Sequence, residues 1–234
     1  MSMLTWLGHS AFKIEAGGAS VVIDPFFAPK WGMSAKDAGK PDMVLVTHDH
    51  SDHVGEAVEI CKQSGAKLGC IVGTAAKLVE NGLPQEQVLN GIGFNIGGTM
   101  SWKGISATMA QAFHSSDSGA PAGYVIRMPD GLVLYHAGDT GIFSSMAELG
   151  SIYGIRCALL PIGGVFTMDA TQAANACKLL GCELVAPMHW GTFPMLAQST
   201  DEFKARLAEI APACHCLDLA PGKPCDLARE LAKA

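Results

Sequence analysis

A short polar stretch at residues 47–53 follows directly after the apolar run 43–46, and it constrains the chain more than any other feature. Residues 48–53, His-Asp-His-Ser-Asp-His, place three imidazoles and two carboxylates within six positions. These groups are the ligands that borderline divalent metals prefer. A helix cap formed by Ser51 or Asp52 is the structural alternative, but capping needs no histidines. The stretch therefore predicts a metal site at the end of a buried strand.

The spacing within this stretch predicts two neighbouring binding points. His48 and His50 are two residues apart, so an extended backbone directs both rings to the same side, where they can bind one ion. Asp52 and His53 are adjacent, and a turn at this position directs them to a second point close by. We therefore expect four side chains of the stretch to take part in metal binding.

The composition limits the class of protein and its partners. A chain of 234 residues, 49% of them hydrophobic, suits a single α/β domain over residues 1–234. The formal net charge of -6 and the lack of a basic run argue against nucleic acid as a partner. Neither a signal-peptide pattern nor an apolar run of membrane-spanning length is visible. We expect a cytoplasmic protein that does not bind membranes, and the sequence leaves a homo-oligomer open.

The eight cysteines include no C-x-x-C motif, and most stand in apolar or helical runs. For a cytoplasmic protein they are expected to be reduced thiols that serve as small core residues. The triplet Cys214, His215 and Cys216 resembles a metal motif, but on a strand the two thiols face away from the imidazole. We therefore favour a structural role for this triplet.

The pattern of apolar runs and glycine turns predicts two similar halves, each a meander of strands followed by strand–helix alternation. Strands are expected at residues 4–7, 11–15, 20–23, 43–46, 68–72, 105–112, 123–127, 132–136, 158–161, 184–187 and 214–217. Helices are expected at residues 54–63, 74–80, 169–180 and 201–209. Two such halves predict two sheets packed face to face with helices outside. The apolar loop at residues 26–42 is expected to be a lid or a docking surface.

Three more ligand-type residues, His114, Asp139 and His189, follow expected strands. Together with H-x-H-x-D-H at residues 48–53, they resemble the signature of the metallo-β-lactamase superfamily. The segments at residues 6–10, 23–25 and 138–140 resemble a branch of small metal-dependent hydrolases that is similar to the ascorbate-phosphate lactonases. The resemblance implies an α/β fold: a four-layer αββα sandwich of two mostly antiparallel sheets with helices outside.

The resemblance also implies a site with two divalent metal ions. Its ligands correspond to His48, His50 and His114 for one ion, to Asp52, His53 and His189 for the other, and to Asp139 as the bridge. We assign catalytic roles to Asp52 and His189 as well. Zinc is the first expectation for this donor set, with manganese, iron or nickel as alternatives.

The expected chemistry is hydrolysis. Two dications about 3.5–4 Å apart can share a water and lower its pKa towards neutrality, which makes a bridging hydroxide available. Their net positive charge favours a small anionic substrate or a developing oxyanion. We expect cleavage of a small ester, lactone or phosphodiester. A metal-binding sensor or scaffold without turnover is the alternative.

Four other polar residues lie outside the proposed set of metal ligands. His9 is expected near the site, in contact with a ligand or with substrate, or else bonded to backbone. Asp24 ends a buried strand and is expected to orient a ligand imidazole. His136 is interpreted as a core histidine and Asp169 as a helix N-cap. The aromatic residues that follow His189 are expected to wall the pocket.

Overall fold

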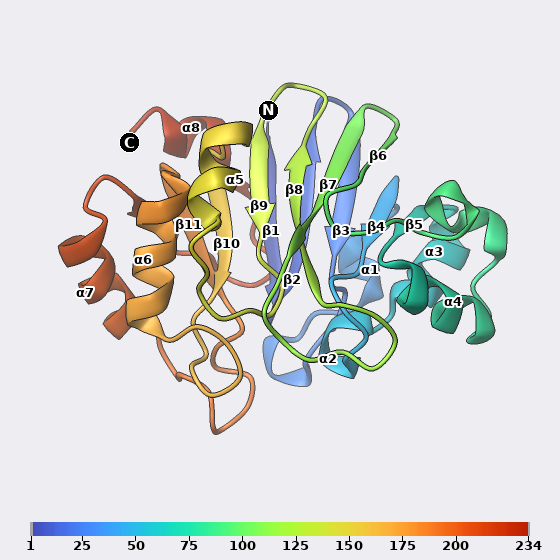
Figure 1. Cartoon of the computed structure of the whole chain (residues 1–234), viewed down its shortest axis with the longest axis horizontal. Coiled ribbons are helices and arrows are strands. Elements are labelled where there is room, and N and C mark those ends of the chain that lie inside the picture. Colours follow the sequence, from blue (N-terminus) through green and yellow to red (C-terminus); the bar gives the residue numbers. More distant parts are fainter. Residues whose placement is uncertain (1, 234) are drawn as a thin grey trace.

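The computed structural model describes residues 2–233 and arranges them as two mixed sheets that pack face to face, with helices on the outer faces (Figure 1). The first sheet has the strand order β13-β1-β2-β3-β4-β5. Its strands are β1 (Met3–Gly8), β2 (Ala11–Ala16), β3 (Ala19–Ile23), β4 (Met43–Leu45), β5 (Lys67–Gly69) and β13 (Cys225–Asp226). The meander β1-β2-β3 is antiparallel, whereas β3, β4 and β5 run parallel.

The second sheet repeats this division between antiparallel and parallel pairing. Its order is β12-β11-β10-β9-β8-β7-β6, with β6 to β9 antiparallel and β9 to β12 parallel. Its strands are β6 (Thr99–Trp102), β7 (Ile105–Gln111), β8 (Ala122–Arg127), β9 (Val133–His136), β10 (Cys157–Pro161), β11 (Leu184–Met188) and β12 (His215–Cys216). The expected two-layer core of sheets is thus confirmed, and parallel pairing appears where a helix connects two strands of the same sheet.

Helices follow the strands of the parallel halves. They are α1 (Ala35–Ala38), α2 (Ser51–Val54), α3 (Ala57–Ser64), α4 (Val72–Glu80), α5 (Met146–Tyr153), α6 (Ala170–Leu180), α7 (Asp201–Ile210) and α8 (Leu227–Leu231), with 3-10 turns η1 (Pro29–Trp31), η2 (Gln85–Gln87) and η3 (Leu89–Gly91). In Figure 1, α3 and α4 lie beside β5, α6 lies beside β10 and β11, and α7 lies on the outer side of α6. Over residues 2–233, we find no helix with the length and apolar character needed to cross a bilayer.

Strand β4 is buried on both faces, which explains its uninterrupted apolar sequence. Met43 and Leu45 belong to the core between the two sheets. Val44 faces the other way, into a second core that includes Ile60 and Leu78 from the helices α3 and α4. This double burial fixes the strand that delivers residues 48–53 to their positions.

Several element boundaries differ from the expected ones. The helix expected at residues 54–63 is divided into α2 and α3 at Gly55, whose backbone has a φ of 43°. A side chain at this position would collide with the carbonyl oxygen of Pro25, so the close approach of the two segments requires glycine. The strand expected at residues 68–72 ends at Gly69, because Val72 already begins α4.

The cysteine triplet has the alternation expected of a strand. Cys214 is buried and Cys216 is half-buried, whereas His215 is exposed. All eight cysteines of the chain are free. Cys214 lies close to Cys177 and Cys182 in the interior, a grouping that the spacing of these residues in the sequence did not indicate.

Candidate metal centre

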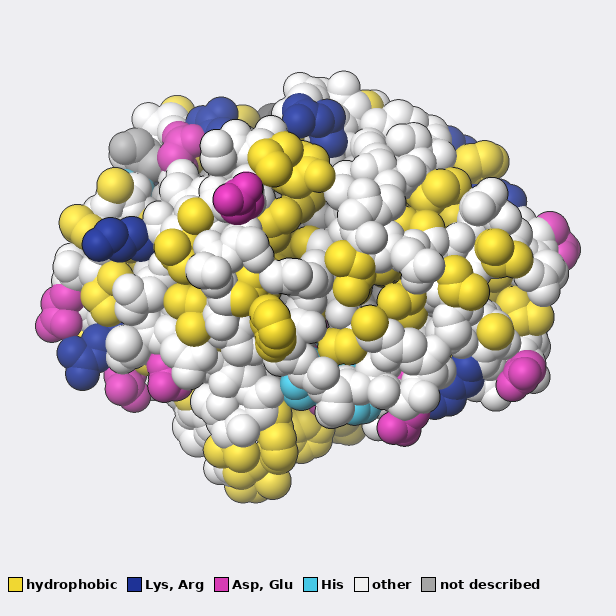
Figure 2. Space-filling view, viewed as in Figure 1, with side chains coloured by type: hydrophobic (Ala, Val, Ile, Leu, Met, Phe, Trp, Pro, Cys, Tyr) yellow, Lys and Arg dark blue, Asp and Glu magenta, His cyan; other side chains and the backbone are white. Residues whose placement is uncertain are grey.

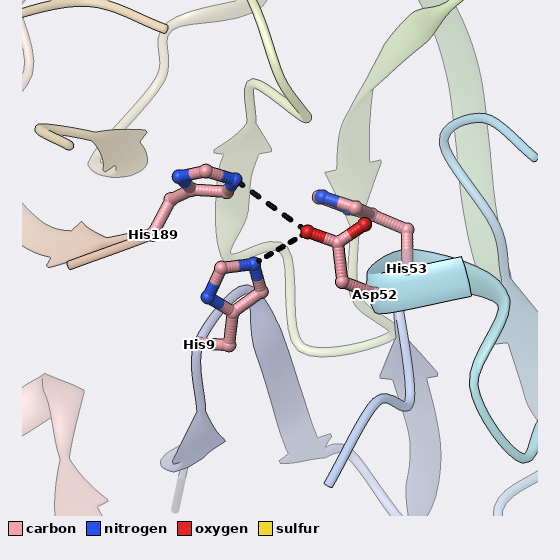
Figure 3. A group of neighbouring side chains, drawn as sticks. All are labelled: His9, Asp52, His53 and His189. Atoms are coloured by element: carbon pink, nitrogen blue, oxygen red, sulfur yellow. Dashed lines mark hydrogen bonds and ion pairs between the residues drawn. The ribbon is translucent and has the colours of Figure 1, made fainter. Parts of the chain in front are cut away.

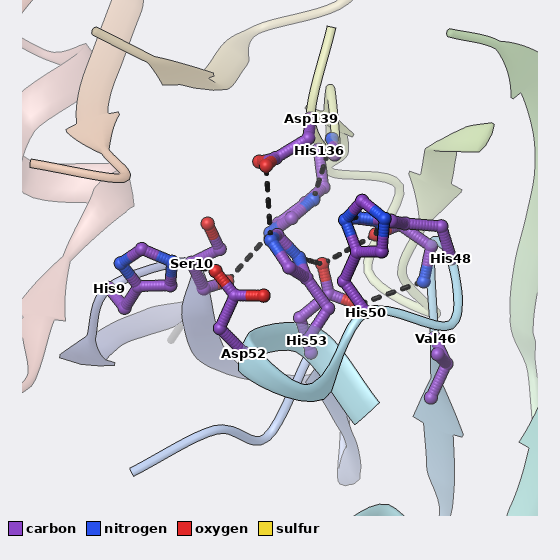
Figure 4. Close-up of polar contacts among 12 residues, drawn as sticks. His9, Ser10, Val46, His48, His50, Asp52, His53, His136 and Asp139 are labelled. Atoms are coloured by element: carbon purple, nitrogen blue, oxygen red, sulfur yellow. Dashed lines mark hydrogen bonds and ion pairs between the residues drawn. The ribbon is translucent and has the colours of Figure 1, made fainter. Parts of the chain in front are cut away.

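The seven candidate ligands lie at one end of the two sheets, after the carboxyl ends of strands that run in the same direction. Residues 48–53 follow β4 and include the short helix α2. His114 follows β7, Asp139 follows β9 and His189 follows β11, and these three strands share one direction within their sheet. The close-ups in Figures 3 and 4 show six of the seven side chains, all but that of His114, converging on a common space. The structure brings all seven residues together, and their roles as metal ligands stay a prediction.

Three imidazoles form the first group of donors. One ring nitrogen from each of His48, His50 and His114 lies within 4.8 Å of the others. The Nε2 atom of His48 is 2.9 Å from Nδ1 of His50, and the His114 ring centre is 5.1 Å from both other rings. This is the clustering expected of three ligands to one ion.

A second group lies beside the first and contains His9, Asp52, His53 and His189 (Figure 3). Asp139 stands between the two groups. Its Oδ2 atom is 2.9 Å from Nε2 of His189, 3.3 Å from Nε2 of His53 and 3.6 Å from Nε2 of His114. The geometry therefore suits Asp139 as a bridging carboxylate, while its role as a ligand stays a prediction.

The donor set fits a divalent metal cation. Within residues 2–233, His53 Nε2 and Asp139 Oδ1 are buried atoms that make no hydrogen bond. Buried polar atoms without a partner are costly, and a cation between them would satisfy both. Neutral imidazoles with a few carboxylates are the donors that zinc and similar metals bind. These orphaned atoms support a metal centre independently of the sequence motif.

A buried hydrogen-bond network orients His53. The carboxylate of Asp24 accepts hydrogen bonds from His53 Nδ1 at 2.7 Å, from the Thr47 backbone N–H at 2.8 Å and from the Thr47 hydroxyl at 2.7 Å. Burial raises the pKa of Asp24, but the charge of His53 and its hydrogen bond outweigh burial and hold the pKa below its ordinary value. Asp24 thus orients a candidate ligand, as expected, and directs His53 Nε2 towards Asp139. Thr47 was not anticipated from the sequence.

His9 lies inside the second donor group. Its Nε2 atom is 3.2 Å from Oδ2 of Asp52, its Nδ1 atom is 3.0 Å from the Thr192 hydroxyl, and its ring centre is 4.2 Å from that of His189. Burial lowers the pKa of His9 to about 4, although the hydrogen bond to Asp52 opposes this shift. His9 is therefore neutral at physiological pH and holds Asp52 in position.

Three residues at the site have a left-handed backbone. His9, Asp24 and His189 have φ values of 50°, 45° and 57°. They are three of the five non-glycine residues with positive φ between residues 2 and 233. This conformation costs about 1–3 kcal/mol for such residues, and it is concentrated at functional sites. Backbone strain at these three residues thus accompanies the orientation of their side chains at the site.

Asp49, the residue between the first two histidines of the motif, was not assigned a role by the sequence. Its Oδ1 atom accepts hydrogen bonds from the Ser116 hydroxyl and the Asp117 backbone N–H, both at 2.8 Å. Its Oδ2 atom lies 2.8 Å from Nζ of Lys77 on α4. Asp49 therefore ties the loop that carries His114 to the turn that carries His48 and His50.

Two further polar residues have structural roles, as interpreted from the sequence. His136 is buried, with Nε2 bonded to the Ser10 carbonyl oxygen and Nδ1 accepting from the Gly138 N–H. Asp169 caps α6 by accepting a hydrogen bond from the Gln172 N–H. Neither belongs to a candidate donor group.

The aromatic residues of the His189 loop divide between two environments. The Trp190 ring stacks on Trp6 at 5.3 Å between ring centres and also contacts Trp31. The loop at residues 26–42 is thereby anchored against this part of the molecule. Phe193 is exposed beside His9, at 5.6 Å between ring centres, so of the two aromatic residues it is the one that lies next to the second donor group.

Comparison with known proteins agrees with the geometry. A family model described as the beta-lactamase superfamily domain matches residues 3–189. A UPF0173 metal-dependent hydrolase of Nitratidesulfovibrio vulgaris is 59% identical over 232 residues, covering 97% of this chain and 95% of the relative. A protein of the same description from Caldivirga maquilingensis is 43% identical and covers 95% of this chain and 96% of its own.

A solved structure shows the same fold. Igni18, a metallo hydrolase of the archaeon Ignicoccus hospitalis, superposes with a TM-score of 0.86 at 39% identity, covering 96% of this chain and 97% of the other. The region matched by the family model, residues 3–189, includes every candidate ligand from His48 to His189. The chain therefore belongs to the UPF0173 metal-dependent hydrolase family, within the beta-lactamase superfamily.

Proposed function

We propose that this protein is a dinuclear metallohydrolase that cleaves a small ester, lactone or phosphodiester. The observation that carries the proposal is the position of Asp139 between two groups of imidazoles. The family membership and the metallo hydrolase structure at 39% identity support hydrolysis as the reaction class. We propose zinc as the metal, because imidazole-rich sites with two carboxylates suit it.

Divalent cations at such a site polarise a carbonyl or phosphoryl oxygen and lower the pKa of a water towards neutrality. The residues of the chain prepare the site for this chemistry. Asp24 fixes the orientation of His53, and neutral His9 holds the Asp52 carboxylate. The side chain of Asp52 is 24% exposed, against 3% for Asp139, so Asp52 lies at the open side of the centre. We propose that Asp52 and His189 contact the reacting group of the substrate.

The charge of the centre favours a particular kind of substrate. Two divalent cations held by only two carboxylates, Asp52 and Asp139, leave a net positive charge in a site with little water. Such a site stabilises the negative charge that develops on an oxygen during acyl or phosphoryl transfer. We therefore propose a small substrate that is anionic at the scissile group or becomes so in the transition state.

Elemental analysis and a substrate panel test the proposal. We expect protein purified without added metal to contain two divalent ions per chain. We also expect it to hydrolyse at least one class among chromogenic esters, lactones and phosphodiesters. A chelator should abolish turnover, and the metal found by analysis should restore it. Bound metal without turnover on any class would instead indicate a sensor or scaffold, and one ion per chain would contradict a dinuclear centre.

A further inference from the structure

Large apolar side chains are exposed around the candidate metal centre. Ten large hydrophobic residues are exposed between residues 2 and 233, and half of them lie on the three loops that follow β7, β10 and β11. We call these five residues the apolar rim: Phe113, Val165, Phe166, Phe193 and Met195. Exposed fractions of 62% for Phe113 and 67% for Val165 show that neither side chain serves the core.

Hydrogen bonds hold the three loops next to one another. The Phe113 N–H donates to the hydroxyl of Thr140, the neighbour of Asp139, at 2.9 Å. The Thr140 carbonyl accepts from the Met168 N–H at 3.0 Å, which connects the loop after β10. The Gly163 carbonyl accepts from the Ala197 N–H at 3.1 Å, which connects the loop after β11. The loops that carry the rim residues are therefore fixed side by side at this end of the molecule.

The rim lies directly beside the candidate ligands. Phe113 precedes His114 in the chain, and the Phe193 ring meets the His9 ring edge-on. His9 in turn packs against His189. In Figure 2, yellow hydrophobic side chains gather at the lower end of the molecule, next to the cyan surface of histidines. An apolar surface thus borders the place where we propose that hydrolysis occurs.

The two loops that carry four of the five rim residues have no charged side chain beside them, whereas the loop after β7 carries Asp117 and Asp169 ends the loop after β10. Residues 162–168 and 190–200 contain no Lys, Arg, Asp or Glu. Contiguous exposed apolar surface in a protein of this size marks a binding site for apolar groups. Because the rim is continuous with the donor groups, a molecule bound at the centre is the occupant best placed to cover it.

We propose that the apolar rim binds an uncharged alkyl or aryl group of the substrate. The substrate is then an amphiphile, whose hydrolysable group lies at the metal centre while its hydrocarbon portion covers the rim. This inference rests on the proposed function and adds to it the chemical class of the substrate. A second copy of the chain is the competing occupant, and the experiment below distinguishes the two.

The test compares substrates that differ only in chain length. We expect the kcat/KM of the metal-loaded protein to rise along p-nitrophenyl acetate, butyrate, hexanoate and octanoate, by up to about fourfold for each methylene buried on the rim. Phe166→Ser and Met195→Ser, at two exposed rim positions, should each remove much of this increase. Ile152→Ser is the matched control, because Ile152 lies on α5 outside the rim and is exposed, as the two rim residues are. It should leave kcat/KM unchanged for every ester of the series. If the substrate panel identifies a different class of ester, the same comparison is made with n-alkyl derivatives of that class in place of the p-nitrophenyl esters.

The outcomes separate the rim from the reaction. Turnover that does not depend on chain length would overturn the rim proposal and leave the hydrolase proposal standing. If no substrate turns over, the proposed function fails. The rim is then tested separately, by measuring the affinity of the protein for n-alkyl carboxylates from acetate to decanoate by calorimetry. Tightening with chain length that Phe166→Ser reduces would support the rim, and binding without such a trend would overturn it. Sedimentation tests the competing occupant. If the protein is a dimer that Phe166→Ser dissociates, and kcat/KM does not change with chain length, the rim is the interface with a second copy of the chain.

Discussion

Asp24 and His53 are joined by a hydrogen bond of 2.7 Å between Oδ2 and Nδ1, and both side chains are completely buried. The bond leaves only Nε2 of His53 free to face Asp139. Carboxylates that accept the second N–H of a ligand histidine fix its tautomer and raise its basicity. A residue that touches no metal in our assignment therefore decides how one candidate ligand is presented.

Asp24→Asn should weaken metal binding by about 10- to 100-fold, because the amide removes the negative charge behind the imidazole. Competition with a chromophoric chelator measures this affinity. Asp169→Asn is a matched control, since Asp169 caps α6 and contacts no candidate ligand. Unchanged metal affinity in a folded Asp24→Asn protein would show that His53 does not depend on this carboxylate.

His48→Ala should lose the ion that we assign to His48, His50 and His114, together with most of the hydrolytic activity. The measurement is metal content per chain and kcat/KM on the substrate found in the panel. His215→Ala provides the comparison, because His215 is exposed on β12 and should be dispensable. A His48→Ala protein with both ions and full turnover would disprove the ligand assignment.

The position of the candidate ligands could be predicted because each follows an apolar strand. Double burial makes β4 a continuous apolar run, so the polar residues after it stand out in the sequence. The same contrast marks His114, Asp139 and His189 at the ends of β7, β9 and β11. A strand end limits where the next few residues can lie, so the approximate location of these side chains could be predicted without knowing the paths of the loops.

Other features depend on contacts between distant segments and could not be predicted. The bond of Asp49 with Ser116 joins residues 67 positions apart and depends on the path of an irregular loop. Helix α5 was not among the expected helices, and it contains Gly150, a residue of low helix propensity. In the structure, Gly150 lets α5 approach the Leu180 carbonyl at the end of α6, where any side chain would collide. The glycine serves packing, which local sequence patterns do not reveal.

Asp49→Asn should release the ion of the first donor group more readily than that of the second. The amide cannot accept all three hydrogen bonds of the carboxylate, so the loop that carries His114 loses about 1–3 kcal/mol of anchoring. Stepwise metal removal with a chelator should show one ion leaving at least tenfold faster than in the wild type. Asp218→Asn breaks a surface pair with Lys204 and serves as the control. Parallel loss of both ions would contradict a local anchoring role.

Acid should destabilise the protein partly through His136. Burial lowers the pKa of His136, so the folded protein keeps the ring neutral while the unfolded chain takes up a proton near pH 6.5. Because the unfolded state binds more protons, the free energy of unfolding should fall as the pH drops below about 6.5, by at most about 1.4 kcal/mol per pH unit for this group. His136→Gln, which can still donate to the Ser10 carbonyl oxygen, should make this fall less steep in urea unfolding at pH 5.0–7.0. Equal slopes for the metal-free wild type and variant would show that His136 does not contribute to the acid sensitivity.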